Sequence, residues 1–286
     1  MSNEKNIDIW IKWKLPALLV FILILICWLY RVTLLQTVQL FSDPQGNMSH
    51  GWLITVCSVY AIWRQRASLR STEKHYSLTG ILCMLLSLAL LWLGNEHSLL
   101  WLQQISFISL IWSLIYALWG WKVARLTMFP VWYLTFTISI PSVLENLILK
   151  LQDISTTASY YLMSGCGFDI FQQGNDLLSS IEGSEFQFNI AGACSGIRSL
   201  LALTAFTALY AWYTQKTLIQ KWLLFFCSFP VAILCNVIRV FSICLVAVTF
   251  GQETAVGYYH DYSGYVVVLL AIVLIFKLGS VISKIK

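Results

Sequence analysis

Charged side chains are scarce in this sequence, and their scarcity decides the class of protein. Asp, Glu, Lys and Arg make up only 11% of the 286 residues, whereas 58% of the residues are hydrophobic. An ordinary soluble domain contains roughly 25% charged residues. A mean hydropathy of +0.74 agrees with this difference. The composition therefore excludes a soluble protein and indicates a membrane protein.

Interdomain linkers and internal repeats are also missing. Apolar segments recur from residue 15 to residue 283, and no stretch rich in Pro, Gly or Ser separates them. No lipidation motif appears, and the first apolar run lacks the small-residue cleavage site of a signal peptide. We therefore expect a single membrane-embedded domain over residues 1–286, with the first run retained as a helix.

The residue spacings that hold metals, phosphates or nucleic acids do not occur. The sequence contains no C-x-x-C, H-x-x-x-H or H-E-x-x-H spacing and no glycine-rich phosphate loop, so it predicts neither a metal site nor a cofactor. The net charge of +5 arises from short basic clusters between apolar runs. A nucleic-acid partner would require one basic stripe, so none is expected.

The apolar runs themselves predict an all-α polytopic membrane protein. Crossing roughly 30 Å of hydrocarbon takes about 20 residues, and the second and fifth runs are short for this length. About eight transmembrane helices are expected, over residues 15–35, 50–63, 79–94, 99–119, 126–141, 196–213, 222–249 and 263–283.

The basic residues predict the orientation of these helices. Loops on the cytoplasmic side of a membrane carry an excess of Lys and Arg. With the N-terminus inside, all but four of the 18 Lys and Arg residues fall on the cytoplasmic side. The exceptions are Arg31, Lys150, Arg198 and Arg239. The sequence thus predicts a multi-pass protein of the cytoplasmic (inner) membrane with both termini cytoplasmic.

A polar stretch over residues 142–193 predicts a small subdomain at the outer face. Its first part has apolar residues at helical spacing with Glu145, Lys150 and Asp153 among them, which is typical of an amphipathic interfacial helix. Its second part, from Phe168 to Ile190, contains turn formers and the alternating segment EFQFNI, which predict a small hairpin. The hairpin leads the chain to Cys194.

Three polar segments are expected to meet at the outer face: AGACSGIRS over 191–199, NVIRV over 236–240 and HDYSG over 260–264. Cys194 precedes a predicted helix and has Gly192 and Gly196 beside it. Free N–H groups at a helix N-terminus stabilise a thiolate, so Cys194 is a candidate nucleophile. A disulfide with Cys166, or simple packing, is the alternative, and the residues alone leave the choice open.

Arg239 is a second candidate because of its depth. It lies 17 residues beyond Trp222, which places it about 25 Å above the cytoplasmic boundary in a helix. A guanidinium at such a depth is costly and usually functional. Asn236 shares its helix face. The alternative is an Arg239 that reaches outward to water or pairs with Glu253.

His260 begins the last predicted helix on the same side. A histidine exchanges protons with a thiol near neutral pH, and it also commonly anchors a helix end at the interface. Arg198, four residues after Cys194, is either an anion site, an interhelical pair or a second basic residue of the site. Candidate supporting residues are His50, Ser195 and Asp261.

Read together, ACSGIRSL, CNVIRVFSI and HDYSGYVVV resemble the three signature segments of the exosortase/archaeosortase family of membrane cysteine transpeptidases. The upstream segments MSHGWLI, WRQR and MFP…ISIP resemble exosortases in the same order. The resemblance implies that Cys194 is the nucleophile, Arg239 the catalytic arginine and His260 the catalytic histidine.

The resemblance also implies the partners. The expected substrates are exported, membrane-anchored proteins ending in a short motif, a transmembrane helix and a basic cluster, the PEP-CTERM type of tail. The product would pass to a cell-surface acceptor. Two rival hypotheses stay open: a transporter that binds an anionic substrate at Arg198 and Arg239, and a non-catalytic scaffold joined by a disulfide between Cys166 and Cys194.

Overall fold

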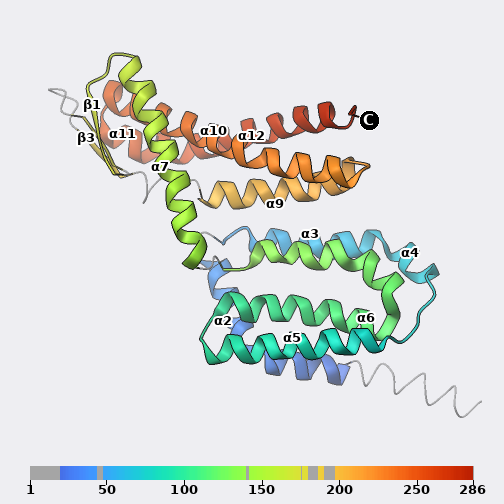
Figure 1. Cartoon of the computed structure of the whole chain (residues 1–286). Coiled ribbons are helices and arrows are strands. Elements are labelled where there is room, and N and C mark those ends of the chain that lie inside the picture. Colours follow the sequence, from blue (N-terminus) through green and yellow to red (C-terminus); the bar gives the residue numbers. More distant parts are fainter. Residues whose placement is uncertain are drawn as a thin grey trace, which may run out of the picture. The chain divides into compact units, whose positions relative to one another are not determined.

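The structure is a computed structural model that describes residues 20–43, 48–139, 142–174, 176–179, 186–189 and 197–285. The chain divides into two compact units, Met1–Ser139 and Ile140–Lys286. Each unit is built mainly of helices and is described by itself (Figure 1). The single domain expected over 1–286 stays a prediction.

The helices of the first unit follow the predicted apolar runs. They are Val20–Leu29, α2 Arg31–Ser42, α3 Gly51–Arg64, α4 Arg66–Ser71, α5 Leu78–Glu96, α6 Leu100–Trp132 and the 3₁₀ helix η1 Tyr133–Thr137. The predicted run 15–35, of which 15–19 lie outside the described residues, falls on two helices, Val20–Leu29 and α2.

The bend in this first run has a tertiary cause. Val20–Leu29 and α2 meet at 72°, and Tyr30 lies at the bend. The Tyr30 side chain is fully buried, with its hydroxyl 2.5 Å from Ser106 Oγ and its ring packed on Phe107. Because these partners come from α6, local periodicity carried no sign of the bend.

The helix α6 turns back on itself at Gly120. The backbone angles of this residue, φ 79° and ψ 175°, lie outside the helical region. Trp112 Nε1 donates to Ala124 O at 2.9 Å, although a separation of 12 positions would span about 18 Å in an unbroken helix. Residues 100–119 and 121–132 are therefore separate arms, as the predicted runs 99–119 and 126–141 require.

The second unit contains the predicted outer-face subdomain and three long helices. Its elements are α7 Ser142–Gly165, β1 Ile170–Gln173, β2 Asp176–Ser179, β3 Phe186–Asn189, α9 Ile197–Thr214, α10 Leu218–Phe250, α11 Gln252–Thr254, the π segment η2 Ala255–Tyr259 and α12 His260–Ile282. The interfacial position of α7 stays a prediction, but its helical form is confirmed.

The predicted hairpin is confirmed and is larger than expected. Strands β1 and β2 pair antiparallel, with Gln173 opposite Asp176. Gly174 in the connecting turn has φ 61°, which glycine adopts without strain. β3 pairs with β2 and completes a three-stranded antiparallel meander in the order β1-β2-β3. The all-α class therefore holds with one small sheet added.

The burial pattern is that of a membrane protein. Small hydroxyl side chains are buried between helices: Ser58 Oγ donates to Pro130 O at 2.7 Å, and Ser159 Oγ to Val237 O at 3.3 Å. Large apolar side chains face outward instead, among them Leu53, Leu86 and Leu269, each about two-thirds exposed (66%, 59% and 64%). Small and polar residues between helices with apolar residues outside are the arrangement that a bilayer favours.

The number of spans differs from the expected eight. Among the described residues, four helices are long and apolar enough to cross a membrane, and a fifth is added if the bent pair Val20–Leu29 and α2 is one span. The 14-residue α3 falls short, and the two arms of α6 count as one helix. The polytopic membrane class is thus confirmed, whereas the count of eight is not.

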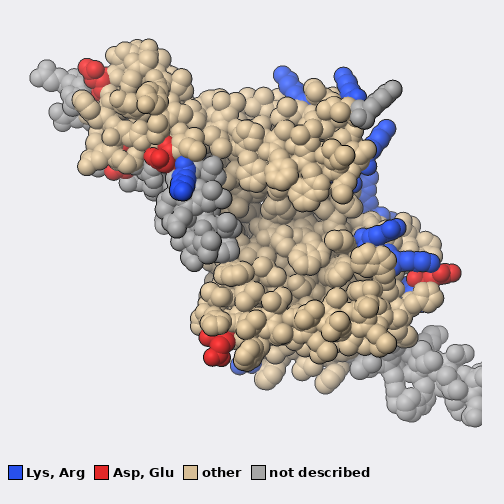
Figure 2. Space-filling model, viewed as in Figure 1, with Lys and Arg blue, Asp and Glu red and all other residues tan. Residues whose placement is uncertain are grey.

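Basic side chains gather at one end of the helices in each unit, as Figure 2 shows. In the second unit, Gln215 Nε2 donates to Gly279 O at 3.1 Å and Gln220 Nε2 to Ile285 O at 2.8 Å. These bonds bring together the end of α9, the start of α10 and the end of α12. This end carries Lys216, Lys221, Lys277 and Lys284. The sheet and the start of α12 lie at the other end.

Candidate active site

The candidate site lies where α10 passes the first turn of α12. Arg239 of α10 and His260, the first residue of α12, are 21 positions apart in the sequence and in direct contact. Arg239 Nη2 lies 3.3 Å from His260 Nε2 and donates to the carbonyl oxygen of His260 at 3.2 Å. Both side chains are partly buried. The predicted meeting of these two residues is therefore seen.

The connection between α10 and α12 determines where His260 lies. Gly251, with φ 90°, ends α10, and the π segment Ala255–Tyr259 leads directly into His260. Ala255 is fully buried in an apolar cluster with Val240 and Ile243 of α10. This packing holds the returning chain against α10. Single π turns occur often at functional sites.

Hydrogen-bond chemistry fixes the tautomer of His260 in this arrangement. A guanidinium only donates hydrogen bonds, so the contact at 3.3 Å requires Nε2 of His260 to accept. The contact suits the tautomer of His260 that carries its proton on Nδ1. Ser263 Oγ also donates to the carbonyl oxygen of His260, at 2.9 Å. An accepting Nε2 is the state in which a histidine can take a proton from a thiol.

Gly264 makes room for the guanidinium. A Cβ at this position would lie 3.3 Å from Nη2 of Arg239, which is tighter than most Cβ contacts, so the guanidinium would have to shift slightly. Gly264 comes four residues after His260 and so shares its helix face. Sequence reasoning missed Gly264 and Ser263 as parts of the site, although both belong to HDYSG and their spacing from His260 was a usable signal.

Asn236 lies one turn before Arg239 on α10 and is 7% exposed. Its Oδ1 and the Nε of Arg239 are buried, and neither has a hydrogen-bond partner in the part of the chain that the structure describes. Buried polar atoms are nearly always paired. The site therefore offers one acceptor and one donor that the described protein leaves unused.

The other predicted residues are distributed as follows. Cys194 and Ser195 lie outside the described residues, as do the side chains of Arg198, in the first turn of α9, and Asp261, in the first turn of α12. His50 belongs to the first unit, where it precedes α3. Cys166 is a free, exposed cysteine after α7.

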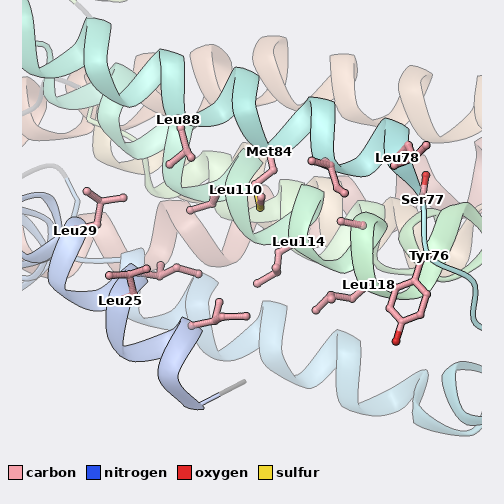
Figure 3. Close-up of a pocket in the computed structure, with 14 residues that line it drawn as sticks. Leu25, Leu29, Tyr76, Ser77, Leu78, Met84, Leu88, Leu110, Leu114 and Leu118 are labelled. Carbon is pink, nitrogen blue, oxygen red and sulfur yellow. The ribbon is translucent and has the colours of Figure 1, made fainter. Parts of the chain in front are cut away.

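One cavity belongs to the first unit and has a different character. It measures about 590 Å³ and lies between Val20–Leu29, α5 and α6 (Figure 3). Leucine, isoleucine and methionine side chains dominate its wall, and none of the candidate residues lines it. No group of three or more His, Cys, Asp or Glu that could hold a metal occurs within the described ranges. The candidate catalytic groups in the described residues are therefore Arg239 and His260.

Comparison with known proteins adds one match. Neither the curated proteins nor the solved structures contain a match to the chain. Residues 42–277 match the family described as transmembrane exosortase. The matched range includes all three predicted signature segments and both residues of the observed contact. Because it covers most of the 286 residues, the chain belongs to the transmembrane exosortase family.

Proposed function

We propose that this protein is a membrane cysteine transpeptidase that removes the C-terminal sorting signal of exported proteins and transfers them to a surface acceptor. Family membership gives a transmembrane sorting transpeptidase in general. The observation that carries the finer proposal is the contact between Arg239 and His260, at 3.3 Å between Nη2 and Nε2. It joins two of the three residues that the mechanism requires.

The third residue, Cys194, comes shortly before α9 in the sequence. Leu200, in the first turn of α9, packs against a cluster that contains Cys235, one turn before Arg239. Cys194 precedes Ile197, the first residue of α9, by three positions. Three extended residues span at most about 11 Å. The short separation from α9 supports the proposal that the thiol of Cys194 works together with Arg239 and His260.

The mechanism follows from the properties of the three side chains. Nη2 of Arg239 first leaves Nε2 of His260 for the substrate oxygen. The freed lone pair of Nε2 takes the proton of the Cys194 thiol, and the sulfur attacks the scissile carbonyl carbon. Arg239 donates hydrogen bonds to the oxygen that becomes negative. His260 then returns the proton to the leaving amine, and the C–N bond breaks. The substrate remains as a thioester on Cys194, and the tail leaves with its new amino terminus.

A second nucleophile completes the transfer. An amine of the acceptor attacks the thioester carbon, its proton passes through His260 to the sulfur, and the free thiol is restored. Water in place of the amine gives hydrolysis. A substrate helix anchored in the bilayer holds the scissile bond at a constant depth, which provides proximity without a deep pocket. The basic end of each unit supports a site on the outer side of the membrane.

The test is a co-expression assay with a tailed substrate. Wild type is compared with Cys194→Ala, Arg239→Ala and His260→Ala, and loss of the tail is followed by the mass of the substrate. We expect all three variants to stop tail removal. Cys166→Ala is the matched control, because it removes an exposed cysteine of the same unit, and it should remain active.

Two results would decide against the proposal. Tail removal by Cys194→Ala at the wild-type rate would exclude Cys194 as the nucleophile. If Cys166→Ala and Cys194→Ala each abolish tail removal, and non-reducing gels show a disulfide between Cys166 and Cys194 in the wild-type protein, the scaffold hypothesis is favoured. A transporter would leave the substrate mass unchanged in every variant.

A further inference from the structure

Two buried polar atoms on α10 make no hydrogen bond with the described residues. Oδ1 of Asn236 and Nε of Arg239 have no hydrogen-bond partner within the described parts of the chain. Asn236 is 93% buried, since its exposed fraction is 7%. Buried polar atoms nearly always have a partner, so unpaired ones point to a ligand or to bound water. A ligand at this place must match both atoms.

The two atoms are chemically complementary. The amide oxygen of Asn236 only accepts a hydrogen bond, and the Nε–H of Arg239 only donates one. Residues three apart on a helix are neighbours on one face, with Cβ atoms about 5–6 Å apart. α10 thus presents one acceptor and one donor, side by side, to whatever lies on this face.

A second nitrogen of Arg239, Nη2, already has partners within the protein. Nη2 is held by His260, through both the ring and the backbone oxygen. On α10 the pair falls between two apolar clusters, one ending at Cys235 and the other beginning at Val240. Asn236 and Arg239 therefore form a polar gap in an otherwise apolar helix, beside the residue that the proposed mechanism uses as its acid and base.

An extended peptide residue fits this pair. In a strand, the N–H and the C=O of the same residue point to the same side and exchange two hydrogen bonds with a partner. We propose that Asn236 Oδ1 accepts the backbone N–H, and Arg239 Nε donates to the backbone C=O, of one extended residue of the substrate's recognition segment. This subsite rests on the proposed function, because it assumes that a polypeptide is the substrate.

Such a subsite reads the backbone and not the side chain. It tolerates any residue with a free N–H and rejects one whose nitrogen is alkylated, which includes proline. It also holds the substrate extended next to His260, so that the scissile bond approaches Cys194 in a fixed direction. Asn236 is on this account a substrate-binding residue and takes no part in the proton transfers.

The experiment is a double-mutant cycle between protein and substrate backbone. The probe is a fluorescent synthetic copy of the recognition segment and helix of the substrate cleaved in the co-expression assay. A series of peptides carries one N-methyl group at successive positions. Binding to the full chain with Cys194→Ala, in detergent, is measured by fluorescence anisotropy, alone and combined with Asn236→Leu.

We expect N-methylation at one position to weaken binding about tenfold, the effect of one backbone hydrogen bond. Asn236→Leu should weaken binding of the unmodified peptide by a similar factor and abolish the effect of N-methylation at that position only. Thr249→Val is the matched control on α10, because it removes a hydroxyl that bonds only within its own helix; it should leave every affinity unchanged.

The opposite result is equally clear. If the N-methyl penalties are the same with Asn236 and with leucine at every position, the subsite is wrong. If the Asn236→Leu protein does not fold, the same cycle is measured with Asn236→Ala. Because binding is measured without cleavage, tail removal that persists in Cys194→Ala rejects the nucleophile and leaves the cycle valid. Additive penalties with normal Cys194-dependent cleavage reject the subsite alone, and a peptide that does not bind rejects both.

Discussion

Nη2 of Arg239 lies 3.3 Å from Nε2 of His260 and 3.2 Å from the carbonyl oxygen of the same residue. One nitrogen of the guanidinium thus holds both the ring and the backbone at the start of α12. This double contact makes the position of the arginine and the tautomer of the histidine depend on each other.

Arg239→Lys keeps the positive charge but loses the planar fork and the Nε–H donor. We expect tail removal to fall about 10²- to 10³-fold, as when an oxyanion donor is lost, while the yield of folded protein stays normal. Initial rates per folded protein, from size-exclusion chromatography, provide the measurement. Arg31→Lys is the control, because Arg31 stacks on Trp28 in the other unit. Wild-type activity in Arg239→Lys would mean that charge alone suffices.

Gly264→Ala should separate stability from activity. Glycine inside a helix costs roughly 0.5–1 kcal/mol relative to alanine, so the folded state should become slightly more stable. The new Cβ would meet Nη2 of Arg239 at 3.3 Å and displace the flexible guanidinium. We therefore expect an unchanged or higher Tm together with a slower cleavage rate.

Gly165→Ala provides the comparison for this variant, since a Cβ there meets nothing within 4 Å. It should cleave at the wild-type rate. A Gly264→Ala protein that loses stability and activity in parallel would show that the glycine serves backbone packing and not the placement of Arg239.

Gly120→Ala should weaken the first unit. With φ 79° and ψ 175° this residue occupies a region that only glycine adopts easily, and other residues pay about 1–3 kcal/mol there. Its Cβ would also lie 2.8 Å from the backbone oxygen of His75. Gly251→Ala has similar backbone angles, φ 90° and ψ 158°, with open space around it. Thermal unfolding in detergent should rank Gly120→Ala below Gly251→Ala; equal Tm values would exclude the contact with His75.

The predicted orientation can be tested with thiol labelling. In Cys194→Ala protein, the exposed Cys166 should react with a membrane-impermeant maleimide on intact cells. Ser283→Cys in the same background, with Cys166→Ala, places a thiol at the exposed end of α12, and it should react only after permeabilisation. The reverse pattern would place the candidate site on the cytoplasmic side.

The helices were predictable because their signal is local. Each predicted apolar run is mostly helical where the structure describes it, and the break between the runs 99–119 and 126–141 corresponds to the reversal at Gly120. The bend at Tyr30 was not predictable, because it depends on Ser106, 76 residues away. The segment EFQFNI indicated a strand where β3 lies, but the division of residues 170–189 into three strands was missed because a two-stranded hairpin was expected.

The candidate site was predictable as a set of residues but not as a geometry. Arg239 and His260 stood out as polar groups at matching depth, and the family resemblance gave them roles. The importance of Gly264 depends on where a guanidinium comes to lie, and the unused atoms of Asn236 and Arg239 depend on which neighbours are buried beside them. Neither property belongs to a residue in isolation.

The π segment before α12 has a consequence for evolution by insertion and deletion. Each residue added to or removed from a helix rotates everything after it by about 100°. The five residues Ala255–Tyr259 therefore set the angular phase of α12 relative to α10. Loss of one of them would leave the length, hydrophobicity and membrane insertion of α12 almost intact, yet it would turn the His260 ring away from Arg239. The length of this short segment therefore matters as much as its sequence.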